Sequence, residues 1–116
     1  MHAEAIARLR ELCQSLPETT EDRGVGAPAF KVNAKIYAMQ HQNQGRPSLW
    51  CKAPSGVQDA LVASDPERFF VPPYVGHHGW IGLYLDIDVD WSEAAELIEE
   101  SYRMTAPKRL SKLLDT

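Results

Sequence analysis

The spacing of apolar residues near the amino terminus predicts an amphipathic helix. From Ile6 to Leu16, apolar side chains recur three, four and three residues apart, which places them on one face of a helix over residues 3–15. Pro17 ends this pattern. The polar stretch that follows, residues 18–23, fits either a short edge strand or a loop.

Alternation of apolar and polar residues then predicts three strands. Residues 29–32 alternate, and Asn33-Ala34 stands where a two-residue turn would reverse the chain, because asparagine tolerates the positive φ of such turns. The chain is expected to return as a strand over residues 35–41. After a polar loop, a third strand is expected over residues 48–52, with Cys51 facing the core as an inert thiol.

The next part of the chain predicts a short helix and two more strands. Ser55 is expected to cap a helix that runs to about Ser64. A short strand over residues 69–71 ends at a Pro-Pro pair. A clear apolar strand follows over residues 81–85.

The carboxyl-terminal part predicts the last helix and a short tail. Asp90 and Glu93 have the spacing of a capping box, so a helix is expected over residues 91–105. Residues 108–114 fit a short basic amphipathic tail. The order of elements, α-β(3)-α-β(2)-α, predicts an α+β fold: a two-layer sandwich of an antiparallel sheet with helices on one side.

The length of the chain and its charge limit the number of domains and the kinds of partner that we expect. The 116 residues make a single domain, residues 1–116, and the net charge of −4 argues against general coating of nucleic acid. The charge is uneven, with +3 over residues 23–83 and −7 over residues 84–102. The middle of the chain therefore presents a mildly basic face, unless these charges only cover solvated surface.

Targeting and redox signals predict a cytoplasmic protein. The two cysteines are not in a Cys-x-x-Cys pair, and the first residues lack the apolar core of a signal peptide. No stretch approaches a membrane span, so we expect no contact with a membrane. We expect a soluble, reduced, monomeric protein without cofactors.

Several motifs together resemble the MmcQ/YjbR family of small bacterial proteins, also called DUF419. These motifs are Leu16-Pro17-Glu18-Thr19-Thr20-Glu21, Pro28-Ala29-Phe30-Lys31-Val32, Lys35-Ile36-Tyr37-Ala38, Leu49-Trp50-Cys51-Lys52-Ala53, Asp65-Pro66-Glu67-Arg68-Phe69-Phe70, Tyr74-Val75-Gly76, Gly79-Trp80-Ile81 and Ser101-Tyr102-Arg103. The resemblance implies a secretion-chaperone-like α-β(3)-α-β(2)-α sandwich with a double-wing shape. Members are often labelled as DNA-binding, and the resemblance supplies no catalytic residues.

A DNA-binding function would use the basic hairpin face. Strand alternation places Tyr37 with Lys35 and Trp50 with Lys52, so bases could stack on aromatic rings while ammonium groups meet phosphates. The competing interpretation, favoured for Trp50 and Trp80, is that the aromatic rings pack under the helices. The candidate DNA-binding residues are Lys31, Lys35, Arg46, Trp50, Lys52 and Arg68.

The alternative is a pocket for a small molecule or peptide at residues 72–80. Its candidate lining is Tyr74, His77, His78 and Trp80. We expect no metal there, because adjacent histidines on an extended chain point to opposite faces. The sequence shows no nucleophile with a base and an orienting partner, so we expect no catalytic residues and no enzyme.

Overall fold

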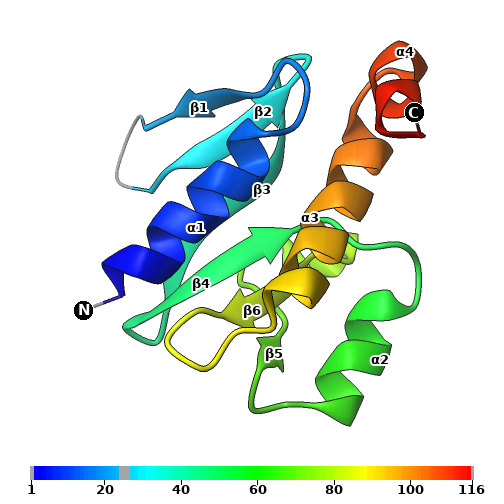
Figure 1. Cartoon of the computed structure of the whole chain (residues 1–116). Coiled ribbons are helices and arrows are strands. Elements are labelled where there is room, and N and C mark those ends of the chain that lie inside the picture. The colour runs from blue at the N-terminus through cyan, green and yellow to red at the C-terminus, as the bar shows by residue number, and fades with distance from the viewer. Residues whose placement is uncertain (1, 24–26, 116) are drawn as a thin grey trace.

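The computed structural model describes residues 2–23 and 27–115, and its centre is a six-stranded antiparallel sheet. The strand order is β1-β2-β3-β4-β6-β5, so β4 and β6 are neighbours in the sheet although β5 lies between them in the sequence (Figure 1). The strands are β1 (Thr20–Asp22), β2 (Ala29–Val32), β3 (Lys35–Asn43), β4 (Arg46–Cys51), β5 (Phe69–Phe70) and β6 (Ile81–Tyr84).

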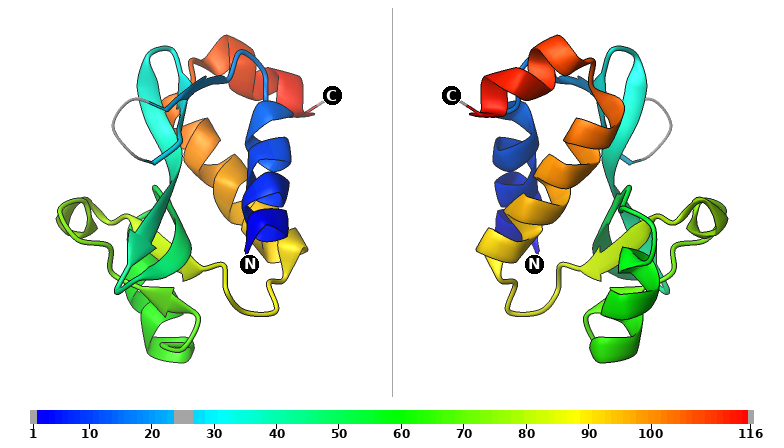
Figure 2. Two further views of the ribbon diagram at one scale, coloured as in Figure 1. Left: turned by 90° about the vertical axis from the view of Figure 1, so that its left-hand side faces the viewer. Right: turned by 90° about the vertical axis from the view of Figure 1, so that its right-hand side faces the viewer.

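Two long helices cover one face of this sheet and make the second layer (Figure 2). The helices are α1 (Ala3–Gln14), α2 (Val57–Ser64), α3 (Trp91–Thr105) and α4 (Lys108–Ser111), with short 3₁₀ turns η1 (Gly76–His78) and η2 (Lys112–Asp115). The covering helices are α1 and α3, whereas α2 lies at the β5 end of the sheet. The segment between β5 and β6 projects beyond the sheet on the side opposite α1.

The α+β fold predicted from the sequence is confirmed, with small differences in local structure. The stretch after Pro17 forms β1, an edge strand. Ser55 does not cap α2, because that helix begins one residue later, with Gly56 at the N-cap at φ +86°. Asp90 does cap α3 by accepting hydrogen bonds from two backbone N–H groups, but the Glu93 carboxylate binds Arg68 instead of closing the capping box.

A bulge in β3 sets which side chains enter the core. Phe30 pairs with Ala38 and Lys31 with Ile36, so Tyr37 is the extra residue. Ala38 pairs with Cys51 and faces the helices, and the bulge turns Tyr37 to the same side. Tyr37 therefore lies on the same side of the sheet as Lys35, as predicted, but it is buried and could not stack on a nucleic-acid base.

Tyr37 is fully buried and joins the sheet to the helical layer. Its hydroxyl donates to the backbone oxygen of Cys13 at 3.0 Å and is 2.9 Å from the hydroxyl of Thr19. Its ring meets the ring of Tyr102 edge to face at 5.3 Å between centroids. Burial first, and the neighbouring thiol of Cys13 second, raise the pKa of Tyr37.

No helix among the described residues is long and apolar enough to cross a bilayer.

Candidate functional site

The structure does not bring the predicted DNA-binding residues into one patch. Lys35 begins the nine-residue strand β3, whereas Arg46 pairs with Asn43 at the other end of that strand. At about 3.3 Å per residue, the two positions lie roughly 26 Å apart. The two hairpin turns that flank β3, next to Lys35 and to Arg46, therefore lie at opposite ends of that strand.

Three of the predicted basic residues already have carboxylate partners. Lys31 bonds Asp22 at 3.1 Å across the edge of the sheet. Arg46 makes a bidentate pair with Asp86 at 2.8 and 2.9 Å, and its guanidinium lies 3.5 Å from the centroid of the Tyr84 ring. These contacts hold the Arg46 side chain along β4 and β6.

Arg68 is also held by acidic residues. Its guanidinium bonds Asp65 at 2.5 Å and Glu93 at 2.6 Å. Both carboxylates raise the pKa of Arg68, Glu93 most. The contacts tie the end of α2 to the first turn of α3, so Arg68 is a structural residue at the join of two helices.

The aromatic side chains of the predicted DNA-binding face are also engaged. Trp50 and Trp80 are only 3% and 8% exposed, so the prediction that they are buried is confirmed. Trp50 packs against His41 and Phe70, however, and neither tryptophan belongs to the core cluster under the helices, so the predicted location is wrong for Trp50. His41 stacks on Trp50 at 4.6 Å between centroids, and the Trp50 indole N–H donates to the hydroxyl of Ser48 at 2.9 Å. A nucleic-acid base could therefore not stack on Trp50 without displacing His41.

Replacing Arg46 with methionine is expected to lower the free energy of unfolding by about 1 kcal/mol at pH 7, because it leaves Asp86 without its partner. Arg46 holds the pKa of Asp86 below its ordinary value. The pair therefore contributes fully above about pH 4, and its contribution is lost as pH falls through the depressed pKa of Asp86. Urea unfolding at pH 7 and pH 3 checks this. An unchanged midpoint at pH 7 would show that Arg46 is not a structural residue.

One open groove gathers two of the residues predicted for the alternative site. We call it the α2–loop groove; its volume is about 550 Å³. It lies between the first turn of α2, the η1 turn and the end of α3. Its lining residues are Ala53, Pro54, Ser55, Gly56, Gln58, Asp59, Gly76, His77, His78, Gly79 and Met104.

The walls of the α2–loop groove are fixed by hydrogen bonds across it. The side-chain amide of Gln58 donates to the backbone oxygens of Gly76 at 2.8 Å and Trp80 at 2.6 Å. The rings of His77 and His78 lie close together, 3.9 Å between centroids. The groove is therefore preformed, which lowers the entropy cost of binding.

Exposed apolar side chains are found in the lining of this groove and on the loop that forms one of its walls. Among the described residues, the exposed large hydrophobic side chains are Val71, Tyr74, Met104 and Leu113. Met104 lines the groove, and Val71 packs against Gly76, where an added Cβ would lie 2.4 Å from its side chain. Tyr74 lies two residues before Gly76. One of these four side chains, Met104, thus lines the groove, and two others, Val71 and Tyr74, belong to the loop that forms one of its walls.

Tyr74 is presented to solvent by a strained loop. Its side chain is 89% exposed and its φ is +68°, an unfavourable conformation for a residue with a Cβ. Pro72 and Pro73 precede it, and their backbone oxygens accept hydrogen bonds from Gly76 and Val75 at 2.9 and 2.8 Å. The loop is therefore held in a shape that exposes an aromatic ring.

The sequence prediction of this site was partial. His77 and His78 line the groove and Tyr74 stands beside it, whereas Trp80 is buried and contributes its backbone oxygen. Met104 and Asp59 were missed, because only tertiary packing brings α2 and the end of α3 to this loop. The exposed position of Met104 on an otherwise amphipathic helix is the signal that could have found it.

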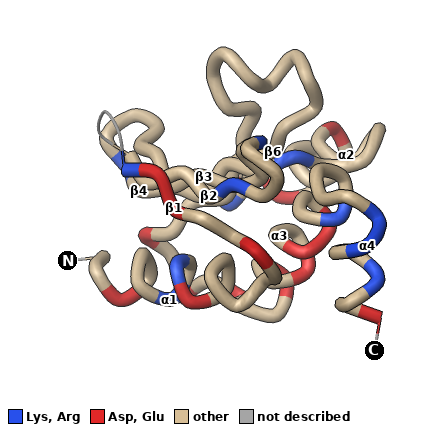
Figure 3. The backbone as a smooth tube through the Cα atoms, turned by 90° about the horizontal axis from the view of Figure 1, so that it is seen from above, with Lys and Arg blue, Asp and Glu red and all other residues tan. Residues whose placement is uncertain are grey.

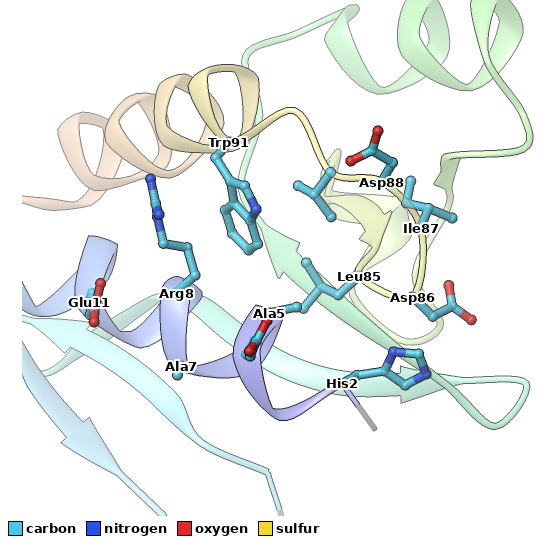
Figure 4. Close-up of a pocket in the computed structure, with 12 residues that line it drawn as sticks. His2, Ala5, Ala7, Arg8, Glu11, Leu85, Asp86, Ile87, Asp88 and Trp91 are labelled. Carbon is cyan, nitrogen blue, oxygen red and sulfur yellow. The ribbon is translucent and has the colours of Figure 1, made fainter.

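A second large groove, between α1 and residues 85–91, is less suited to a ligand (Figure 4). Its volume is also about 550 Å³, and its most prominent binding groups are the Trp91 ring and acidic side chains. Arg8 already lies over Trp91, 5.8 Å from the ring centroid, and Arg46 already neutralises Asp86. The Trp91 ring and Asp86 are therefore already engaged by the protein itself.

The residues that could perform covalent or metal chemistry are not assembled in the described part of the chain. Residues 2–23 and 27–115 bring no three His, Cys, Asp or Glu side chains together as a metal site. Cys13 and Cys51 are free and buried, and burial raises the pKa of both thiols.

Fold and groove together define a small α+β domain with an open antiparallel sheet and a preformed surface groove. The chain belongs to the YjbR family, whose model matches residues 14–104. It is similar to the Deinococcus radiodurans protein DR2400, a DUF419 domain, with a TM-score of 0.77 and 22% identity over 95% of this chain and 87% of that one. This likeness concerns the fold. No curated protein matches the chain.

Proposed function

We propose that this YjbR-family domain is a non-catalytic, monomeric cytoplasmic binding module whose ligand is a short peptide segment of a partner protein. One observation carries the proposal: of the four exposed large apolar side chains among the described residues, Met104 lines the preformed α2–loop groove, and Val71 and Tyr74 belong to the loop that forms one of its walls. Exposed apolar groups concentrated at one groove are typical of protein interaction sites.

Peptide binding fits the chemistry of this groove better than binding of a charged metabolite. Its lining combines small and apolar residues with Asp59 and two histidines, and it holds no arginine or lysine to bind a phosphate or carboxylate. Tyr74 supplies the kind of rigid aromatic anchor that dominates binding energy at peptide and protein interfaces. An apolar side chain of the ligand would lie against Met104, while Tyr74 packs on the backbone beside it.

DNA binding is the second candidate, and one observation favours it. Lys35 and Lys52 lie near each other, since burial first and the charge of Lys35 second lower the pKa of Lys52. Two such lysines would give weak, salt-sensitive binding through few phosphate contacts. The other predicted basic residues would first have to leave their carboxylate partners.

The test is a selection for peptides followed by measured affinities. A phage-displayed library of random peptides is selected on the whole protein, and the best peptide is measured by fluorescence anisotropy. Replacing Tyr74 with serine is expected to weaken binding at least about 30-fold, because an interface anchor contributes about 2 kcal/mol or more. Met104→Ser is expected to weaken it several-fold.

Leu113→Ser is the matched control, because Leu113 is 53% exposed but does not line the α2–loop groove. It is expected to change the affinity less than twofold. Failure to enrich any peptide, or peptides that bind the Tyr74 and Met104 variants as well as the wild type, would overturn the proposal.

A further inference from the structure

A third groove, with much apolar surface, adjoins the α2–loop groove. We call it the α2–α3 groove; its volume is about 390 Å³. The two grooves share Ala53 and Pro54, so they meet where the chain leaves β4. The lining residues of the α2–α3 groove are Lys52, Ala53, Pro54, Val57, Leu61, Glu93, Glu96, Leu97 and Glu100.

One face of α3 connects the two grooves. Glu96, Glu100 and Met104 follow one another at four-residue spacing, which places them in one row along the helix. The first two line the α2–α3 groove and the third lines the α2–loop groove. A ligand anchored beside Met104 would therefore meet these two carboxylates if it continued along the helix.

The α2–α3 groove has an apolar floor and an acidic rim. Val57, Leu61 and Leu97 supply apolar surface, each only partly buried against the core. Glu96 and Glu100 are exposed, and neither takes part in an ion pair among the described residues. Figure 3 shows acidic residues along α3, within the part of the chain, residues 84–102, that carries seven acids and no base.

The charges that face this rim leave it negative. Arg68 is already shared between Asp65 and Glu93, so it neutralises neither free glutamate. Lys52 is the only base in the lining. A free carboxylate pair beside apolar surface is complementary to a segment that carries lysine or arginine beside leucine-like side chains.

We infer that the partner segment is basic and amphipathic, and that it occupies both grooves along α3. Its apolar side chains contact Leu61, Leu97 and Met104, and its basic side chains pair with Glu96 and Glu100. The inference rests on the proposed function, because the same segment is anchored at Tyr74 and Met104. It adds the chemical class of the partner, which the α2–loop groove alone does not define.

Two synthetic peptides test the inference on the whole protein. Both have the same leucines at helical spacing, but the polar positions carry lysine in one and glutamate in the other. The lysine peptide is expected to bind the wild type at least tenfold more tightly at low salt, with the difference shrinking as salt rises. Affinity is measured by fluorescence anisotropy, and the site by amide NMR shifts.

Charge reversal of the acidic rim supplies the decisive variants. The double variant Glu96→Lys with Glu100→Lys is expected to bind the lysine peptide at least tenfold more weakly than the wild type, and to bind the glutamate peptide more tightly. The double variant Glu96→Gln with Glu100→Gln keeps side-chain size. For the lysine peptide it is expected to change the logarithm of the dissociation constant by about half as much as the charge reversal does. Glu4→Lys with Glu11→Lys on α1 is the control, with the same change in net charge and an expected effect below twofold.

The outcomes separate this inference from the proposed function. If both peptides bind equally well and shift the amides of His77, His78 and Met104, the basic partner is wrong and the peptide-binding function stands. If reversal on α1 weakens binding as much as reversal on α3, only net charge matters and the inference is overturned. If neither peptide shifts any groove residue, and selection yields none that does, the proposed function fails as well.

Discussion

Replacing Ser101 with alanine is expected to lower the free energy of unfolding by about 2 to 4 kcal/mol, because two buried backbone groups lose their partner. Ser101 is fully buried on α3. Its hydroxyl donates to the backbone oxygen of Tyr37 and accepts from the backbone N–H of Lys52 at 2.9 Å. A methyl group can do neither.

The position of Ser101 explains the size of this effect. The ladder between β3 and β4 runs from Asn43 paired with Arg46 to Ala38 paired with Cys51. The next pair would join Tyr37 to Lys52, but the bulge falls there, and the serine hydroxyl bridges the two backbone groups instead. The Ser101 side chain thus links the backbones of β3 and β4 where their direct pairing ends, and it attaches α3 to the sheet.

Urea unfolding measures the change, which should appear as a lower midpoint with an unchanged slope. Ser111→Ala is the control, because the Ser111 hydroxyl donates to the backbone oxygen of Lys108 on the exposed surface. Its expected effect is below about 0.5 kcal/mol. A Ser101 variant within 0.5 kcal/mol of the wild type would contradict this role of the hydroxyl.

Both thiols are expected to react with iodoacetamide at pH 8 about a thousandfold more slowly in the folded protein than in the unfolded chain. The thiolate is the reactive form, and burial raises the pKa of Cys13 from 9.0 to about 12. Burial also raises the pKa of Cys51. Neither side chain is exposed to the reagent.

Mass spectrometry of time points with and without denaturant checks this protection. Ser92→Cys supplies the positive control, because Ser92 is exposed on the first turn of α3 and its hydroxyl takes no part in the helix cap. The new thiol should react about as fast as those of the unfolded chain. If a native cysteine reacted at a rate within tenfold of this control, it would not be protected by burial, and it could act as a nucleophile.

Features set by neighbouring residues were predictable from the sequence. The bounds of α3 follow from the Asp90 cap and from Pro107, both local signals. The turn at Asn33-Ala34 was also found, since both residues adopt positive φ there, at +53° and +64°. These features do not depend on the rest of the fold.

Features set by distant contacts were not predictable in the same way. The bulge that buries Tyr37 depends on the register of two partner strands and on Ser101, 64 residues away. The pairing of Arg46 with Asp86 joins residues 40 positions apart, so alternation could not show that this arginine is engaged. For the same reason the sequence located the loop of the candidate site but not the helices that complete its groove.

An amide-resolved NMR titration with the selected peptide, and separately with a short DNA duplex, decides between peptide binding and DNA binding. The peptide is expected to shift residues of the α2–loop groove, which cluster in residues 53–59 and 76–79 and at Met104. The duplex is expected to give small shifts near Lys35 and Lys52 that vanish at physiological salt. Strong duplex shifts at residues 31–35 and 46–52, with no peptide shifts in the groove, would overturn the proposed peptide binding and favour DNA binding.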